Sequence, residues 1–165
     1  MAKKTTKDTT KPNKGERPIA ENRKARHNYM VLETLECGIV LVGSEVKSLR
    51  NGRVSLDEAY GRMKDGEMWL VGADIPEYAN ATLWNHEPKR PRKLLVHSSE
   101  VRKFGNKAHE KGLTLVPLKM YFNDRGLAKV LMGLCRGKQL HDKRDSLKKA
   151  DMKREIDRAV SRRMP

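Results

Sequence analysis

The chain has 165 residues, enough for one modest folded domain with tails, and its net charge of +15 lies far outside the ordinary range for globular proteins. Such a balance suits a polyanionic partner, with nucleic acid as the first candidate and an anionic membrane surface as the second. The sequence lacks a membrane-spanning apolar run, a signal peptide and a disulfide framework, which predicts a cytoplasmic protein.

The charge is concentrated at the two ends of the chain. Residues 1–28 hold nine Lys/Arg against three Asp/Glu, residues 136–165 hold eleven against five, and residues 29–135 hold sixteen against thirteen. Within the middle segment, residues 89–111 carry eight Lys/Arg and only two Asp/Glu. Charges that only keep a protein in solution usually mix the two signs. The sequence therefore indicates a nearly neutral body that has one basic patch and two basic arms.

The first half of the chain contains an arm, two strands and a helix. Residues 1–18 are polar and show no apolar period, so we expect them to be disordered. Two short β-rich runs follow at residues 29–34 and 37–42. The stretch "SEVKSLRNG" then indicates a short helix, with Ser44 at its N-cap and Gly52 after its end.

A hairpin and an irregular connection come next. The pair Asp65-Gly66 suits a tight turn, which predicts a hairpin between strands near residues 59–64 and 67–73. Residues 76–93 contain three prolines and many charges, as is typical of a long irregular connection.

The second half contains a helix and another hairpin. The helix is expected to have its N-cap at Ser98 or Ser99 and to be stopped by Gly112, and the hairpin to turn at residues 123–126. Six short strands and two short helices, without βαβ alternation, predict a mainly β fold. The favoured architecture is a small closed or partly closed antiparallel barrel.

The last segment, residues 137–165, favours a helix but has little apolar surface to bury. Met152 and Ile156 lie on one side of a helical wheel, while basic residues surround the whole circumference, unlike in a membrane-surface helix. Ordering a residue costs about 1–2 kcal/mol, which so few apolar contacts cannot repay. We therefore expect a disordered basic tail that becomes a helix of about 30 Å against a polyanion. The predicted units are an arm (1–18), a barrel (19–136) and this tail.

Catalytic patterns in the sequence are weak. Residues 44–47 match S-x-x-K, but no S-D-N or K-T-G element follows, and Asp57 and Glu58 are better explained as local caps. The five histidines lack metal-ligand spacing, so we expect a binding protein with no enzyme activity, cofactor, metal or small-molecule substrate. Aromatic residues make up only 5%, which argues against stacking many single-stranded bases, and no DNA-recognition helix is evident. Structured RNA is the partner that fits best.

Six blocks of sequence carry a resemblance to a known family: "ENRKARHNY", "GSEVKSLRNGRVSLDEAY", "GEMWLVGADIPEY", "NHEPKRPRKLLVH", "KGLTLVPLKMYF" and "GKQLHDKR". From about residue 19 to 149 the chain resembles the bacterial SsrA-binding (small protein B, SmpB) family. The resemblance implies an oligonucleotide-binding (OB)-type barrel with two or three short helices. It also implies binding to the tRNA-like domain of transfer-messenger RNA (tmRNA) and its delivery to stalled ribosomes for trans-translation. The tail would then probe the empty mRNA channel and the decoding centre of the 16S ribosomal RNA.

The resemblance assigns RNA contacts to the body of the protein. Glu36 is expected to accept hydrogen bonds from base amino groups or to orient a nearby arginine, the alternative being an exposed strand carboxylate. Leu95 and His97 match two further contacts, with ordinary core as the alternative for Leu95. The remaining matched positions are His27, Gly137 and Lys138. At Gly137 a side chain would block close approach of the RNA to the backbone.

The resemblance also assigns ribosome contacts to the tail. His141 is expected to stack on an exposed base, Lys143 and Arg144 to meet phosphates, and Asp142 to orient Arg144 or cap the tail helix. The set is completed by Lys148, Lys149, Met152, Lys153 and Ile156. Some family members carry an aromatic residue in the tail where this sequence has none, so Met152 and Ile156 would have to replace it. The alternative function is that of a ribosomal or nucleoid-type protein whose arms clamp phosphates generally.

Overall fold

The computed structural model describes residues 16–81, 84–110, 112–139 and 152. The elements follow the chain in the order β1 (Arg17–Glu21), α1 (Arg23–Asn28), β2 (Tyr29–Ile39), α2 (Gly43–Arg50), β3 (Tyr60–Lys64), β4 (Glu67–Val71), β5 (Arg92–Leu95), α3 (Ser98–Glu110), β6 (Thr114–Phe122) and β7 (Ala128–Gly137). None of the helices in this part of the chain is long and apolar enough to cross a membrane.

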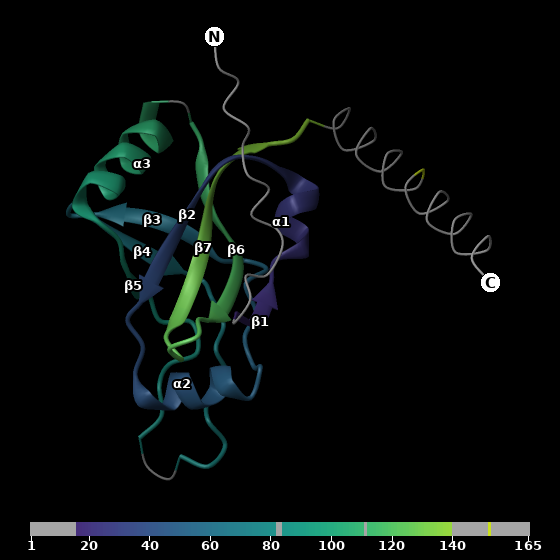
Figure 1. Ribbon diagram of the computed structural model, residues 1–165, viewed down its shortest axis with the longest axis vertical. Coiled ribbons are helices and arrows are strands. Elements are labelled where there is room, and N and C mark those ends of the chain that lie inside the picture. Colours follow the sequence, from purple (N-terminus) through teal and green to yellow (C-terminus); the bar gives the residue numbers. More distant parts are fainter. Residues whose placement is uncertain (1–15, 82–83, 111, 140–151, 153–165) are drawn as a thin grey trace.

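The strands form a closed antiparallel barrel, as the sequence predicts (Figure 1). Six of them pair in the cyclic order β6-β3-β4-β5-β2-β7, and β7 returns to β6 to complete the ring. Strand β1 lies outside this ring, paired with the C-terminal half of β6. Strand β6 therefore contacts three strands, because its other edge is shared between β1 and β3.

The ring closes where β3 meets β6, at the pairing of Gly61 with Leu115. A Cβ atom on Gly61 would lie 2.7 Å from the Leu115 Cβ and 2.8 Å from the Met132 methyl carbon. Real Cβ atoms do not approach neighbours so closely. The missing side chain at residue 61 is thus a condition for closing this barrel.

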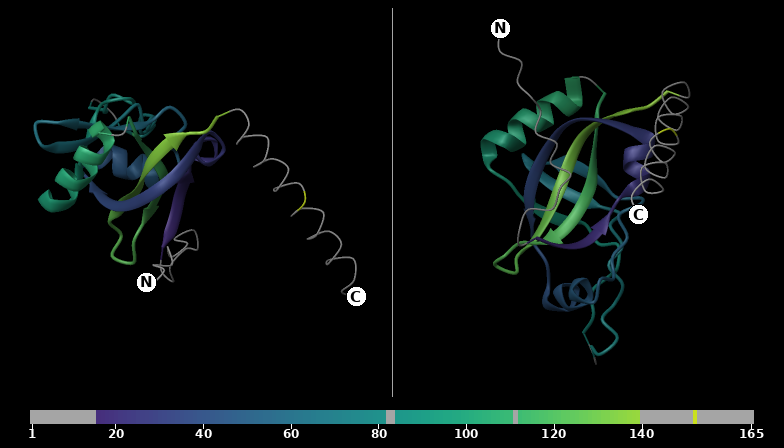
Figure 2. Two further views of the ribbon diagram at one scale, coloured as in Figure 1. Left: turned by 90° about the horizontal axis from the view of Figure 1, so that it is seen from above. Right: turned by 45° about the vertical axis from the view of Figure 1, so that its right-hand side comes forward.

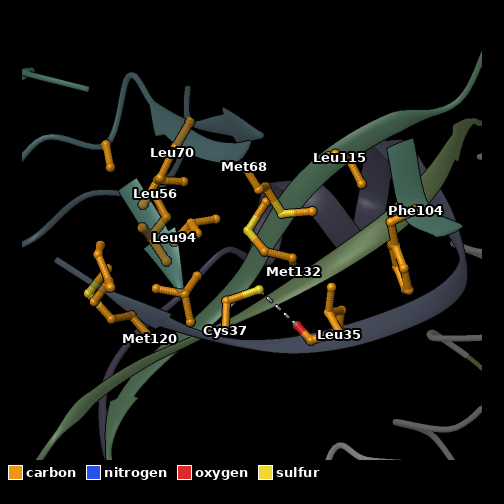
Figure 3. Close-up of a cluster of buried hydrophobic side chains, with 14 of the residues drawn as sticks. Leu35, Cys37, Leu56, Met68, Leu70, Leu94, Phe104, Leu115, Met120 and Met132 are labelled. Atoms are coloured by element: carbon orange, nitrogen blue, oxygen red, sulfur yellow. Dashed lines mark hydrogen bonds between the residues drawn. The ribbon is translucent and has the colours of Figure 1, made fainter. Parts of the chain in front are cut away.

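The interior of the barrel is filled by aliphatic, sulfur-containing and aromatic side chains (Figure 3). Phe104 of α3 and Leu49 of α2 belong to the same core cluster, and these two helices lie at different ends of the barrel (Figure 1). Cys37 is fully buried among them, and this burial raises the pKa of its thiol to about 12. The interior is therefore a packed core in which the Cys37 thiol is buried and protonated.

Helix α1 packs against the outside of the barrel, on the side away from α3 (Figure 2). Its buried residue Ala25 joins a second, smaller apolar cluster on the outer face of β6 and β7, with Val116, Leu118, Leu131 and Cys135. The helix begins after Asn22, whose side-chain oxygen accepts a hydrogen bond from the Ala25 N–H at 2.8 Å. Helix α1 thereby covers the part of the outer face that carries this second cluster.

Both predicted hairpins are confirmed, and the tight turn at residues 65–66 has positive φ at both positions, as Asp-Gly favours. The two runs predicted at residues 29–34 and 37–42 are wrong as separate strands. They form one strand, β2, which ends at Ile39 and absorbs an irregularity between Val31 and Glu33. The inward alternation of Leu35 and Cys37 continues unbroken across the expected gap.

Three elements were not predicted. Strand β1 begins at Arg17, inside the segment expected to be disordered, because β6 offers it a free edge. Helix α1 has only one buried residue, too few to show a helical period. Strand β5 begins in the last two residues of the expected connection and points Arg92 inward, which hides its alternation.

Candidate nucleic-acid interface

Glu36 and Leu95 lie close together on the outer face of the barrel. Leu35 and Cys37 are buried, so Glu36 between them points outward from β2. Two residues further along β2, Gly38 pairs with Leu95 of β5, and a Cβ placed on Gly38 would be 3.2 Å from the Leu95 Cβ. Leu95 is 54% exposed, so the alternative that it is an ordinary core residue is wrong.

The Glu36 carboxylate is held by two side chains from neighbouring strands. The Tyr121 hydroxyl donates a hydrogen bond to Oε2, and the Lys129 ammonium lies 3.4 Å from Oε1. Burial, together with this hydrogen bond, raises the pKa of Tyr121, so the hydroxyl stays protonated and remains a donor. The side chain of Glu36 is nevertheless 52% exposed, which leaves lone pairs of a fixed carboxylate facing solvent.

The side-chain partners of Glu36 within the chain are a tyrosine and a lysine, and the nearby arginine that was one expected partner is not among them. That Glu36 accepts hydrogen bonds from base amino groups stays a prediction. Strand pairing explains the two observed partners: Lys129 of β7 lies opposite Gly38 of β2, and Tyr121 of β6 lies opposite Lys129. A row of outward side chains therefore crosses three strands. The alternation in "LKMYF" indicates that Lys119 and Tyr121 share the outer face. Only the register between the strands shows that Tyr121 lies near Glu36.

The row continues toward β1 through a second lysine. The Lys119 ammonium lies 4.6 Å from the centre of the Tyr121 ring and 2.9 Å from a Glu16 oxygen. Lys119 thus lies over the face of the Tyr121 ring. Lys129 is linked to Tyr121 indirectly, because both side chains contact the Glu36 carboxylate. The arrangement offers hydrogen-bond acceptors for base edges, and its two lysines are each paired with a carboxylate, Lys119 with Glu16 and Lys129 with Glu36.

His97 follows Leu95 by two residues, at the start of α3. Its carbonyl oxygen accepts hydrogen bonds from the N–H groups of Glu100 and Val101, both at 3.0 Å, so His97 occupies the N-cap position. The helix therefore begins one residue earlier than a cap at Ser98 would give, and two residues earlier than a cap at Ser99 would give. The side chain of His97 is exposed, which leaves its imidazole accessible near Leu95.

His27, Gly137 and Lys138 form a separate group at the far end of β2 and β7. Gly137 pairs with Tyr29, which is seven residues, or about 23 Å, along β2 from Glu36. The Lys138 ammonium donates to the Arg26 carbonyl at 3.0 Å, at the C-terminal end of α1. One imidazole nitrogen of His27 lies 3.1 Å from the Asn28 side-chain oxygen. The six predicted positions therefore occupy two places on the surface.

The surroundings of Gly137 are open. A Cβ atom at this position would meet nothing within 4 Å, and its φ lies outside the left-handed region. Neither the fold nor the backbone conformation therefore requires glycine at this position. The predicted reason for the glycine, close approach of an external molecule, is consistent with this geometry.

The basic patch expected at residues 89–111 is largely neutralised. Five of its eight cations pair with carboxylates: Lys89 with Glu58, Arg90 and Arg92 with Glu45, Lys93 with Glu67, and Lys107 with Glu33. The prediction of a free cationic surface is therefore wrong for most of this segment. It treated the charges as independent and solvated, whereas partners far along the chain neutralise them.

The most buried of these pairs form a charged cluster under α2, defined as Glu45, Arg90 and Arg92 (the Glu45 cluster). Glu45 and Arg92 are fully buried, and their closest N–O distance is 2.8 Å. Burial alone would raise the pKa of the Glu45 carboxyl. Hydrogen bonds from Arg90 and the Val42 N–H, together with the charge of Arg92, outweigh burial and hold this pKa below its ordinary value.

The Glu45 cluster also corrects the expected helix cap. Helix α2 begins at Gly43, with Val42 at the N-cap position, and the Glu45 carboxylate accepts from the Val42 N–H at 2.8 Å. Ser44, the expected cap, instead places its hydroxyl 2.9 Å from a ring nitrogen of His86. The role of this cluster is structural, because its charged groups face one another and the backbone rather than solvent.

Most of the predicted tail contacts lie outside the described residues: His141, Asp142, Lys143, Arg144, Lys148, Lys149, Lys153 and Ile156. Met152 is described, in helical conformation and 63% exposed. Over the described ranges, no group of three or more His, Cys, Asp or Glu side chains is arranged to hold a metal ion.

Comparisons with known proteins give a consistent family. The model of the "SmpB protein" family matches residues 19–162. An "SsrA-binding protein" from Rhodopirellula baltica is 58% identical over 146 residues, covering 88% of this chain and 83% of the relative. One from Rhodopseudomonas palustris strain BisB18 is 56% identical over 153 residues, covering 91% and 98%.

A solved structure is also similar to this chain. It is described under the words "tmRNA-SmpB: a journey to the center of the bacterial ribosome". The two chains are 50% identical in sequence and superpose with a TM-score of 0.64, covering 79% of this chain and 94% of the other. With the family model matching most of the sequence and the barrel matching a known member, the chain belongs to the SmpB protein family.

Proposed function

We propose that this protein binds the tRNA-like domain of tmRNA through its barrel and delivers that RNA to stalled ribosomes for trans-translation. The observation that carries the proposal is the 50% identity, across 79% of the chain, to a structure described as tmRNA-SmpB in the bacterial ribosome. The proposed function is binding and requires no catalytic step. Its place of action is the ribosome, in the cytoplasm.

The outer face around Glu36 supports the barrel's part in this function. A carboxylate repels phosphates, so an acidic residue in an RNA interface needs cations beside it and base donors in front of it. Lys129 supplies a cation beside the carboxylate, and the Tyr121 hydroxyl fixes the carboxylate while leaving it half exposed. Leu95 adds apolar surface next to it for a base or a ribose.

We assign the ribosome-contacting role to the tail, residues 137–165, and the RNA-binding role to the barrel. Ten Lys/Arg against five Asp/Glu give the tail the charge to follow ribosomal RNA in the mRNA channel and decoding centre. Because β1 begins at Arg17, the barrel takes in the last residues of the predicted arm.

The test compares the full chain with a version ending at Gln139, measuring tmRNA affinity across a salt series with ordinary tRNA as competitor. The truncated protein is expected to keep its affinity within about threefold, or 0.7 kcal/mol, together with its preference for tmRNA. Tagging of nascent chains on stalled ribosomes is expected to be lost. Unfolding curves for both versions check that the barrel is intact.

A matched variant, Glu36→Gln in the full chain, tests the barrel in place of the tail. It keeps the tail and the shape of the side chain but removes the charge that Lys129 and Tyr121 hold. We expect the preference for tmRNA over tRNA to fall. If truncation instead abolishes affinity, with the salt slope shrinking by roughly 0.7–0.9 per lost phosphate contact, the arms are general phosphate clamps and the proposal fails.

A further inference from the structure

Trp84 is the most exposed large apolar side chain among the described residues, with 90% of its surface accessible. Tryptophan is rarely left in water, because its ring carries a large apolar surface that normally packs against protein. The other tryptophan, Trp69 of β4, is half-buried on the barrel. The connection between β4 and β5 therefore carries one tryptophan, Trp84, whose indole ring is exposed to solvent. Figure 1 shows this connection extending beyond α2, away from the end of the molecule where β7 finishes.

The base of this connection is fixed by buried polar contacts. One nitrogen of the His86 ring lies 2.9 Å from the Ser44 hydroxyl, and the other lies 2.9 Å from the Ile75 carbonyl oxygen. The Ser48 hydroxyl donates to the Pro76 carbonyl at 2.8 Å. Both limbs of the connection are thereby tied to α2 or to each other. A segment without regular structure is held as firmly at its base as a hairpin would be.

The residue next to Trp84 continues this bracing toward the tip. The Asn85 side-chain oxygen accepts from the N–H groups of Tyr78 and His86, both at 3.2 Å, and its amide donates to the Tyr78 carbonyl at 3.1 Å. The Tyr78 ring in turn lies 5.4 Å from the Lys47 ammonium of α2. Trp84 is thus attached directly to a braced residue. Such bracing lowers the entropy lost when the indole binds something.

We propose that Trp84 is a stacking platform for an unpaired RNA base. The inference rests on the proposed function, which supplies the class of partner, and it adds a contact at the α2 end of the molecule. A base stacks on an indole whatever its identity, so a single ring needs no matched pocket in the partner.

The charges around the tip favour RNA over a protein partner. Lys47, Arg50 and Arg53 are exposed along α2 and just after it, and Arg50 and Arg53 form no ion pair with any described residue. Glu77 and Glu87 are exposed on the connection itself. The cations of α2 attract phosphates, which leaves the bases of the same strand free to reach the uncharged indole. A protein hot spot would instead need water-excluding contacts around the tryptophan, and the exposed Asn80 and Asn85 provide polar groups there.

The experiment uses the full chain with Trp69→Phe, so that Trp84 is the sole tryptophan and its emission can be excited selectively. Fluorescence is titrated with tmRNA, with naked ribosomal RNA and with intact ribosomes. Stacking on a base should quench the emission, and the RNA that quenches identifies the source of the base. In the same background, Trp84→Ala should weaken binding to that RNA by about 5–150-fold. Trp84→Phe, which keeps an aromatic face, should retain most of the affinity.

The salt dependence provides a further readout. Because Trp84 carries no charge, Trp84→Ala should lower affinity equally at every salt concentration, whereas Arg50→Ala should reduce the salt slope. Equal affinities of Trp84→Ala and its parent for tmRNA, ribosomal RNA and ribosomes would overturn the inference. A blue-shifted emission seen only with intact ribosomes would also overturn it, because it indicates an apolar protein pocket. If the Trp69→Phe parent itself shows no preference for tmRNA over tRNA, the proposed function fails instead.

Discussion

The substitution Gly137→Ala, which adds one methyl group, tests whether this glycine is needed for the fold or for RNA binding. The position has open space around it and an ordinary backbone conformation, so Gly137→Ala should change the free energy of unfolding by no more than about 0.5 kcal/mol. If RNA approaches the backbone closely here, the same substitution should weaken tmRNA binding by about tenfold, or 1.4 kcal/mol. Urea unfolding and a binding titration on one preparation measure both effects.

The matched control for this prediction is Gly43→Ala. Gly43 also has nothing within 4 Å of a placed Cβ, but it lies in α2, away from the two predicted contact groups. It should leave both stability and RNA affinity near the parent values. Unchanged tmRNA affinity in Gly137→Ala would remove this position from the interface.

At this same scale, the sequence predicts which side chains face outward better than it predicts what they touch. Alternation within β2 places Glu36 outside the barrel, and the structure agrees. Its partners Tyr121 and Lys129 lie 85 and 93 residues further along the chain, so only the register of β6 and β7 identifies them. For Arg92 even the direction of the side chain is hard to predict, because a charged residue is normally exposed to solvent. Its buried partner Glu45 is too far away in the sequence for a local pattern to identify it.

Among the elements, strand β6 is the one on which closure depends. Its pairing with β3 rests on Gly61 lying against Leu115, so Gly61→Ala would push a methyl group into the Leu115 Cβ and the Met132 side chain. Overpacking of this kind costs about 1–3 kcal/mol. The urea midpoint should fall accordingly while the dependence on denaturant stays the same.

The control at this scale is again Gly43→Ala, which adds a methyl group in open space at the first turn of α2. If both variants unfold at the same urea concentration as the parent, the β3–β6 contact is looser than its distances imply. A loss confined to Gly61→Ala would attribute the cost to the closure point.

The elements that sequence reasoning found are those with a local signature. Asp65-Gly66 and the turn at residues 123–126 mark hairpins whose two strands are neighbours in sequence. Strands β1 and β5 have no such signature, because each is defined by the strand edge that it meets: β1 by β6, and β5 by β4 and β2. Their existence follows from tertiary pairing rather than from their own residues.

Across the whole molecule, the Glu45 cluster joins three regions that are distant in sequence: α2, the connection after β4, and β5. The pKa of Glu45 is below its ordinary value in the folded protein, so the unfolded chain binds more protons as the pH falls. The stabilisation that Glu45 contributes is therefore complete above about pH 5 and declines as the pH drops through about 4.3 toward the folded pKa. Urea unfolding at pH 7 and at pH 4 should show this loss in the parent protein.

Glu45→Gln should unfold more easily at pH 7, by about 3–5 kcal/mol, because it leaves Arg92 buried without its counter-charge. It should also lose less stability than the parent between pH 7 and pH 4. Glu67→Gln is the control, since the Lys93–Glu67 pair is partly exposed and should contribute at most about 1 kcal/mol. Identical pH profiles for the parent and Glu45→Gln would show that other carboxylates govern acid unfolding.

The pairing of β2 with β7 has a consequence for how the protein is made. Tyr29 pairs with Gly137, 108 residues later, and β1 pairs with β6 across a similar distance. At about 5–20 residues per second, β2 waits roughly 5–20 s during synthesis for its partner to appear. Its exposed run Met30–Leu32 has an unsatisfied edge throughout that interval. The barrel is therefore a late event in translation, and the nascent chain is most vulnerable to aggregation before β7 has been synthesised.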